Sequence, residues 1–234
     1  MVRIAFDKER VLASHFLLQH LKPEELKRFA ATATLANHQA QSVIFQKGDP
    51  GSSMMAVIRG RVKICARSVD GKELVINILR KDDLFGEIAL LDGEPRTADA
   101  VALEETDLLV LERSKFIPIL MDNPDIALRL LSFMCQRLRI TNEHLEDALF
   151  LEAPARLARC LLRLVPSHGK PAQSGVLLDV KLSQQQLAGL VGLSRERVNK
   201  QLKEWERDGL LSFEKGFVTL HDQHELEQLA SAGA

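Results

Sequence analysis

The chain has 234 residues, of which 46% are hydrophobic and 27% charged, so it has enough apolar side chain for one large domain or two modest ones. Its formal net charge is −1, which gives no overall field toward nucleic acid or membrane. We expect no signal sequence or membrane span, and the three scattered cysteines (Cys65, Cys135 and Cys160) predict core thiols of a reduced cytoplasm rather than disulfides, structural zinc or an iron–sulfur cluster.

The first part of the chain changes from a helical to a strand pattern. Residues 11–31 are predicted to be helical, with Leu17, Leu21, Leu26 and Phe29 on one apolar face and Pro23 in the first turn of a second helix. From Ala40 the apolar residues alternate, and they do so at Val43/Phe45, Met55/Val57, Val62/Ile64, Leu74/Ile76/Ile78, Val101/Leu103 and Leu108/Val110/Leu111. Short strands separated by glycine turns predict a small antiparallel barrel or jelly roll.

The stretch 84–98 carries the residues of an anion site. Gly86 permits a tight turn and the close approach of a ligand, and residues 87–91 suit about one helical turn whose first N–H groups attract an anion. Arg96 supplies a planar fork for phosphate, with the hydroxyl of Thr97 beside it. The carboxylate of Glu87 would repel phosphate and needs a neutral donor, such as a sugar hydroxyl. These residues therefore predict a site for a sugar phosphate.

The order Phe-Gly-Glu-Ile-Ala-Leu…Pro-Arg-Thr-Ala in this stretch resembles the phosphate-binding cassette of cyclic-nucleotide-binding domains. The turn at 48–53 and Gly60 extend the resemblance to about residues 12–120. It implies that backbone N–H groups of Gly86, Ile88 and Ala89 face the ligand, that Glu87 binds the ribose 2′-hydroxyl, and that Arg96 and Thr97 bind the cyclic phosphate. The alternatives are a plain Glu–Arg salt bridge on a surface turn and a cassette that has lost its nucleotide.

A long helix is predicted after the cassette. Ser114 is expected to cap a short helix that ends at Met121, and Asn123-Pro124 separates it from a helix that runs to about Glu152. The apolar residues Leu131, Met134, Leu138, Leu145 and Ala148 follow a coiled-coil heptad in which Thr141 fills the missing seam position. Three explanations of this polar residue stay open: it fixes the register of the coiled coil, it faces a polar group, or it is a small residue that the seam tolerates. The heptad predicts a homodimer along the helix.

The C-terminal part has the pattern of a winged helix-turn-helix. A helix at 155–165, a polar loop at 167–175 and a short strand with Val176, Leu178 and Val180 precede it. Ser183 is expected to cap a helix with Leu187 and Val191, Gly192 to form the turn, and Ser194 to cap a second helix with Val198 and Leu202. Residues 213–220, turning at Lys215-Gly216, are predicted to form a hairpin.

The second of these helices begins with polar side chains that suit DNA. Ser194, Arg195, Glu196, Asn199 and Lys200 are expected to be exposed where base edges are read. Arg forks onto guanine O6 and N7, and Glu accepts from cytosine N4. A charged, solvated helix is the alternative, but the Ser-Arg-Glu order directly after the glycine turn favours binding to double-stranded DNA.

Cassette, long helix and winged reader occur in the order of the cAMP-receptor/FNR superfamily, which the whole chain resembles. The resemblance implies an α+β fold with a cyclic-nucleotide-binding domain at 1–122, a dimerisation helix at 123–152 and a winged helix-turn-helix domain at 153–234. It also implies a cytoplasmic homodimer with cAMP or cGMP as effector, no metal, no membrane contact and RNA polymerase as a further partner.

Three sites in the sequence determine whether the family's preferences for the nucleotide base and for the DNA half-site apply to this chain. Thr141-Asn142 stands where relatives carry a Thr-Ser pair that contacts adenine from both subunits, so Asn142 leaves the base preference open. Thr97 leaves it open too, since a hydroxyl there serves guanine in cGMP-binding relatives. Arg195 and Glu196 match a pair that reads a TGTGA-like half-site, but Lys200 replaces a later Arg and offers a point charge instead of a fork.

Other classes of protein fit the sequence less well. The chain has no nucleophile elbow, metal pair or Walker loop, so we expect no enzyme. A redox or haem sensor of the same superfamily would need a cysteine cluster, which is missing, or an axial ligand such as His20 or His144. A cyclic-di-GMP-responsive or ligand-independent regulator that retains the cassette is the remaining alternative.

Overall fold

The computed structural model describes residues 8–14 and 22–232, which fall into two compact units. The N-terminal unit takes the chain up to Ala66 and again Ile76–Arg137, and the C-terminal unit takes Arg67–Val75 and the chain from Leu138 onward. The division at 137/138 lies inside the long helix α5 (Pro124–Phe150). The domain boundaries at 122/123 and 152/153 stay a prediction.

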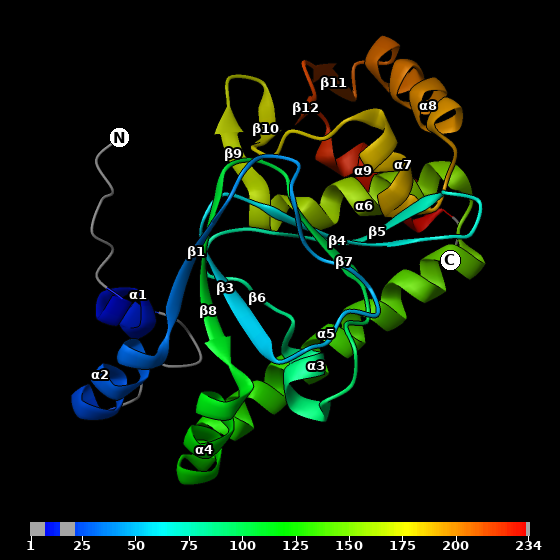
Figure 1. The fold of residues 1–234 in the computed structure, drawn as a ribbon. Helices are drawn as coiled ribbons and strands as arrows, with labels where there is room; N and C mark the ends of the chain where they lie inside the picture. Colours follow the sequence, from blue (N-terminus) through cyan, green and yellow to red (C-terminus); the bar gives the residue numbers. More distant parts are fainter. Residues whose placement is uncertain (1–7, 15–21, 233–234) are drawn as a thin grey trace. The chain divides into compact units, whose positions relative to one another are not determined.

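Two four-stranded antiparallel sheets form the body of the N-terminal unit (Figure 1). The first has the order β1 (Thr34–His38), β8 (Thr106–Glu112), β3 (Ser53–Arg59) and β6 (Leu84–Phe85). The second has the order β2 (Val43–Phe45), β7 (Asp99–Ala102), β4 (Val62–Arg67) and β5 (Glu73–Leu79). The two sheets are not closed into one barrel, so of the two predicted forms the jelly roll is the observed one.

Strand β3 lies between two hydrophobic cores because it is buried on both faces. Met54, Ala56 and Ile58 join a core with residues of α1 (Lys8–Ser14), α2 (Pro23–Thr32), α3 (Glu87–Asp92), α4 (Arg113–Asp122) and α5. Met55 and Val57 point the other way, into a core that includes Phe85 and Ala100. The cassette, which lies between β6 and β7, is therefore mounted on two packed layers.

The N-terminal elements agree with the predicted ones except for two differences. Pro23 opens α2 as predicted, while Leu17, Leu21 and the side chain of Phe29 lie outside the described residues. Strand β1 was not predicted, because its sequence Thr-Leu-Ala-Asn-His has no apolar alternation. The N-cap of α4 is Glu112 rather than Ser114, since the helix begins directly where β8 ends. The predicted break at Asn123-Pro124 is confirmed.

An exposed apolar stripe runs along α5. Its large members are Leu128, Leu131, Leu138, Leu145 and Leu149, each 58–69% exposed. The intervals of three and four are completed by Cys135 and Asn142, whereas the predicted seam contained Met134, Thr141 and Ala148, and Met134 is only half-exposed. Cys65 and Cys160 are buried as predicted, but Cys135 is exposed, so the prediction of three core thiols is wrong for Cys135. None of the described helices is long and apolar enough to cross a membrane.

Within the described residues, the C-terminal unit combines the second half of α5 and four further helices with one small sheet of the order β11-β12-β10-β9. Its elements from α6 onward are α6 (Ala153–His168), β9 (Gly169–Ala172), β10 (Gly175–Leu178), α7 (Gln184–Val191), α8 (Arg195–Arg207), β11 (Leu211–Glu214), β12 (Phe217–Leu220) and α9 (Gln223–Ser231). The predicted loop at 167–175 contains β9, which pairs with β10 through backbone groups and needs no apolar pattern. The predicted hairpin is confirmed as β11–β12, and α9, which packs on α6, was not predicted.

Half-buried His144 on α5 makes stability depend on pH. Burial lowers its pKa below the usual 6.5, and the charge of Arg163 lowers it further against the opposing charges of Asp147 and Glu143. As the pH falls through about 6.5, His144 of the unfolded chain binds a proton, whereas His144 of the folded chain stays neutral. The free energy of unfolding therefore decreases as the pH falls through that value. We expect His144→Gln to lose less stability than wild type between about pH 7.5 and about pH 5.5 in urea unfolding. Equal losses in both proteins would contradict this assignment.

Candidate functional site

The turn into α3 requires glycine. Gly86 is the N-cap of α3 and has φ = 76°, in the left-handed region. A Cβ at this position would lie 2.6 Å from Nη1 of Arg96 and 3.3 Å from the carbonyl oxygen of Ser53. Any larger residue would displace the Arg96 guanidinium, so Gly86 fixes both the turn and the place of the cation.

Arg96 is held inside the N-terminal unit, where it is 5% exposed. Its Nη1 donates to the carbonyl oxygen of Gly86 at 2.9 Å, its Nη2 donates to Oγ of Ser53 at 3.0 Å, and its guanidinium lies 4.3 Å from the ring centre of Phe45. Burial lowers the pKa of Arg96, and the charges of Asp49 and Glu87 oppose the shift. Nε is buried and has no hydrogen-bond partner among the described residues. The side chain is a positioned cation with donor capacity to spare.

Glu87 is the buried carboxylate of the site, at 1% exposure. Nη1 of Arg137 donates to its Oε1 at 2.7 Å, and Nη2 of the same arginine donates to the carbonyl oxygen of Leu84 at 2.6 Å. Oε2 has no hydrogen-bond partner within the described parts of the chain. A buried acceptor without a donor is costly, and a ligand hydroxyl would satisfy it.

Arg137 belongs to the site although it was not among the predicted site residues. It lies on α5, 50 residues from Glu87 in the sequence, and its guanidinium also lies 4.7 Å from the ring centre of Phe133. The available signal was the carboxylate itself, because a buried Glu needs a cation. The pattern of α5 showed several arginines and did not select one.

The remaining predicted ligand residues divide between the two units. Ala89 is buried, Ile88 and Thr97 are exposed, and all three lie with Glu87 and Arg96 in the N-terminal unit. Thr141 and Asn142 are exposed on α5 in the C-terminal unit, so their predicted contact with the ligand stays a prediction.

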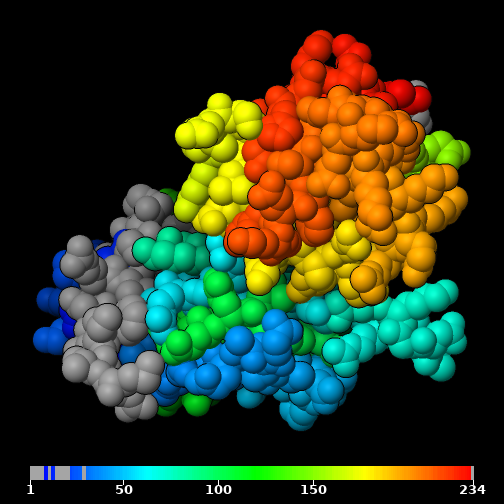
Figure 2. Space-filling model, turned by 90° about the horizontal axis from the view of Figure 1, so that it is seen from above, coloured from blue at the N-terminus to red at the C-terminus, as the bar shows by residue number. Residues whose placement is uncertain are grey.

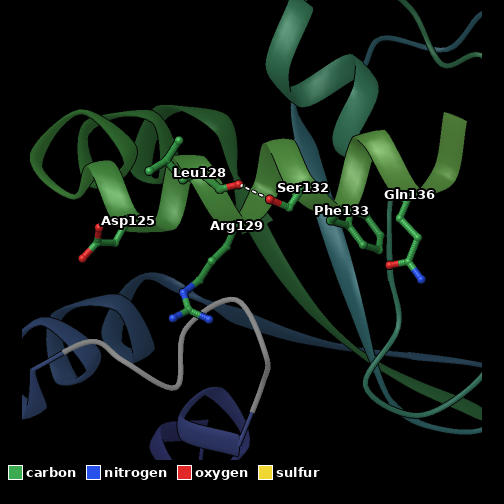
Figure 3. Close-up of a pocket in the computed structure, with 6 residues that line it drawn as sticks. All are labelled: Asp125, Leu128, Arg129, Ser132, Phe133 and Gln136. Atoms are coloured by element: carbon green, nitrogen blue, oxygen red, sulfur yellow. Dashed lines mark hydrogen bonds between the residues drawn. The ribbon is translucent and has the colours of Figure 1, made fainter. Parts of the chain in front are cut away.

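A separate hollow of about 600 Å³ lies beside the first half of α5 (Figure 3). Its lining residues are Asp125, Leu128, Arg129, Ser132, Phe133 and Gln136, which all belong to that one helix. The Ser132 hydroxyl donates back to the carbonyl oxygen of Leu128 at 2.9 Å. The hollow shares no residue with the cassette and is not the predicted ligand site.

Arg137→Ala is expected to destabilise the N-terminal unit by about 3 kcal/mol, because it removes the cation that is hydrogen-bonded to the buried Glu87 carboxylate. The free energy of unfolding in urea measures this loss. Adding Glu87→Gln to the Arg137→Ala variant removes the buried charge and should restore part of the stability. A double variant less stable than Arg137→Ala alone would show that the pair is not the source of the effect.

The helix-turn-helix forms as predicted. The Ser183 hydroxyl accepts from the backbone N–H of Gln186, whose side chain returns to the Ser183 N–H, and this capping box starts α7. Gly192 has φ = 63°, and Ser194 caps α8 by accepting from the N–H of Arg197 at 3.3 Å. The predicted apolar residues Leu187, Val191, Val198 and Leu202 are all buried. Two helices therefore meet at a fixed angle around a shared core.

The predicted DNA-reading residues lie at the start of α8, whose atoms (orange in Figure 2) form an open surface beside β11. Arg195, Glu196 and Lys200 are exposed, as is Ser194. Hydrogen bonds from its own backbone N–H and from the Ser194 hydroxyl lower the pKa of Glu196, so it offers a charged acceptor. Asn199 is only half-exposed, contrary to prediction, because its Oδ1 accepts from Nε2 of Gln184 at 2.8 Å.

Family models identify both parts of the chain. Residues 35–123 match the cyclic nucleotide-binding domain, and residues 155–229 match the Crp-like helix-turn-helix domain. The fold and the site thus define a DNA-binding transcriptional regulator with a cyclic-nucleotide-binding domain. The "CRP-like cAMP-activated global transcriptional regulator" of Mycobacterium tuberculosis is 31% identical over 222 residues, which cover 95% of this chain and 99% of that protein. The chain therefore belongs to the Crp/Fnr family of transcriptional regulators.

Two solved structures show the same fold. The regulator CLP of Xanthomonas campestris, described as c-di-GMP responsive, has a TM-score of 0.75 and 25% sequence identity, and the match covers 86% of this chain and all of CLP. A CRP/FNR-family regulator of Thermus thermophilus has a TM-score of 0.72 and 26% identity at the same coverage of this chain and 100% of its own. CLP is thus described as responsive to c-di-GMP, whereas the Mycobacterium tuberculosis relative is described as cAMP-activated.

Proposed function

We propose that the protein is a cyclic-nucleotide-responsive homodimeric transcriptional regulator, with cAMP as its effector, that reads a TGTGA-like palindrome. The buried Glu87 carboxylate carries the proposal, because one oxygen is held by Arg137 and the other has no hydrogen-bond partner in the described chain. An acceptor of this kind next to a buried cation fits a ligand that has a hydroxyl beside a phosphate. A cyclic ribonucleotide has this combination.

In this proposal the ligand completes the unfinished hydrogen bonds of the site. The ribose 2′-hydroxyl donates to Oε2 of Glu87, and the cyclic phosphate accepts from the Arg96 guanidinium and the Thr97 hydroxyl. The first N–H groups of α3, from Gly86, Ile88 and Ala89, add donors at the positive end of the helix. Arg137 then neutralises Glu87, so that the carboxylate does not repel the phosphate at the site.

The stripe on α5 supports a second copy of this chain as the partner. A row of five exposed leucines at heptad spacing buries itself best against an identical row. Thr141 and Asn142 lie on the same exposed helix, where a base held in either subunit would be reached by polar groups. Binding would favour the dimer state in which both α8 helices face successive major grooves, about 34 Å apart, and RNA polymerase would then respond to the bound dimer.

The cyclic-nucleotide assignment is supported by the printed description of the Mycobacterium tuberculosis relative as cAMP-activated. The description of CLP makes cyclic-di-GMP the second candidate effector. The experiment is a calorimetric titration with cAMP, cGMP and cyclic-di-GMP, each with and without a TGTGA palindrome. We expect cAMP to bind most tightly and to raise affinity for the palindrome. Binding of cyclic-di-GMP alone would replace the effector, and an unchanged affinity for DNA would overturn the proposal.

A further inference from the structure

Three arginines on one face of α6 join the end of α5 to the helices of the C-terminal unit. Arg156, Arg159 and Arg163 follow each other at intervals of three and four residues, so their side chains share one side of the helix. Their partners lie on α5 and on two other helices. We define these arginines and Asp147 as the arginine joint.

Asp147 is the centre of the joint. Its side chain is 2% exposed, and Nη1 of Arg159 donates to its Oδ1 at 2.7 Å. Nη1 of Arg163 lies 2.5 Å from Oδ2 as an ion pair, and Oδ2 has no hydrogen-bond partner among the described residues. Removing either the carboxylate or one of its two arginines would leave a buried charge uncompensated. Such a change strongly destabilises a protein.

Two of the arginines also bind the C-terminal ends of other helices. Nη2 of Arg156 donates to the carbonyl oxygen of Leu151, just after α5, while its Nη1 donates to that of Val191, the last residue of α7. Nη2 of Arg159 donates to the carbonyl oxygen of Ala230 in the last turn of α9 at 2.9 Å. Cations at the negative ends of helices are stabilising. Arg159 thus joins α5 to α9, and Arg156 joins the residue that follows α5 to α7.

We propose that the arginine joint makes the last turns of α5 a rigid arm of the DNA-binding unit, with Asp147 as its positioning residue. A displacement of α5 then moves α6, α7 and α9 with it, and α8 follows because it packs on α7. Any bending of α5 occurs before Asp147. The grouping of the chain from Leu138 with the DNA-binding helices agrees with such an arm. This inference rests on the proposed function, because it explains how an effector signal would reach α8.

Asp147→Asn tests the joint, and Glu146→Gln is the matched control because it removes the neighbouring, exposed carboxylate of α5. Nucleotide affinity is measured by calorimetry, and affinity for a TGTGA duplex of about 30 base pairs is measured with and without cAMP. We expect Asp147→Asn to keep its nucleotide affinity within about twofold and to lose about tenfold or more of the cAMP-induced gain in DNA affinity. Glu146→Gln should retain the gain.

A purely structural role of Asp147 would lower DNA affinity equally with and without cAMP, and this outcome or an unchanged gain would overturn the inference. Arg163→Gln, which leaves Arg159 on Asp147, provides a milder variant if Asp147→Asn fails to fold. Amide hydrogen exchange of residues 144–151 tests the joint without any effector. Exchange there should rise about tenfold in the variant. If the wild-type protein binds no nucleotide, the proposed function is wrong. Amide hydrogen exchange that is unchanged in Asp147→Asn would overturn the arginine joint independently of that result.

Discussion

Replacing Arg96 by alanine is expected to weaken cAMP binding by about 10²- to 10⁴-fold, the largest effect of any single change in the N-terminal unit. The variant loses two charge-assisted hydrogen bonds to the phosphate, each worth about 1.5–3 kcal/mol. The loss is large because the guanidinium is already buried and fixed by Gly86 and Ser53, so wild type spends little ordering it on binding. Calorimetric titration measures the affinity, and the DNA response to cAMP should disappear with it.

The controls separate ligand binding from folding. Ser53→Ala removes one internal hydrogen bond of Arg96 but keeps the guanidinium, so its affinity should stay within about threefold of wild type. Arg96→Lys keeps a charge without the fork and should bind with intermediate affinity. All three variants should elute as dimers. If Arg96→Ala bound cAMP with wild-type affinity, residues 84–98 would be excluded as the nucleotide site.

Local chemistry made the cassette and the two reader helices predictable. The tight turn at Gly86 and the helix caps at Ser183 and Ser194 are decided by a few neighbouring residues, and each was found where the sequence indicated. The alternation of apolar residues likewise located the strands β2 to β5. It did not show that β3 is buried on both faces, because that depends on the helices that cover the first sheet.

The missed features depend on partners that are distant in sequence. Arg137 meets Glu87 across 50 residues, and Arg159 meets Ala230 across 71. No spacing rule selects one arginine among those of α5 and α6, since all of them suit a solvated helix face. Asn199 is a similar case, because its bond to Gln184 depends on the angle between α7 and α8. The sequence thus showed which polar side chains are present, but their hydrogen-bond partners and exposure became known only from the structure.

The arginine joint and the cassette share one physical device. In each, a carboxylate that is at most 2% exposed lies against an arginine of a helix that comes later in the chain: Arg137 for Glu87, and Arg159 with Arg163 for Asp147. A buried ion pair contributes little net stability but specifies one arrangement over its alternatives, a role that we assign to both as a hypothesis. A regulator with two conformations needs such specificity at the ligand site and again at the DNA-binding helices.

Arg195→Ala is expected to remove recognition of one base pair in each half-site. A bidentate contact from Arg to guanine is worth about 1–3 kcal/mol of discrimination, so the preference for the palindrome over a scrambled duplex should fall by about 5- to 150-fold per half-site. Exposed Arg195 lies in the first turn of α8, which suits a base contact. Competition binding with both duplexes in the presence of cAMP measures the ratio.

The matched control is Arg207→Ala, which removes the same side chain from the other end of α8, where it pairs with Asp208. It should leave the ratio unchanged, since that end of a recognition helix lies away from the base edges. Arg195→Ala should also retain non-specific binding and most of its salt dependence, because the phosphate contacts of other residues remain. An equal loss of affinity for both duplexes would instead assign Arg195 to a phosphate. The half-site would then have to be read by Ser194, Glu196 and Lys200, the other exposed polar residues predicted to read bases.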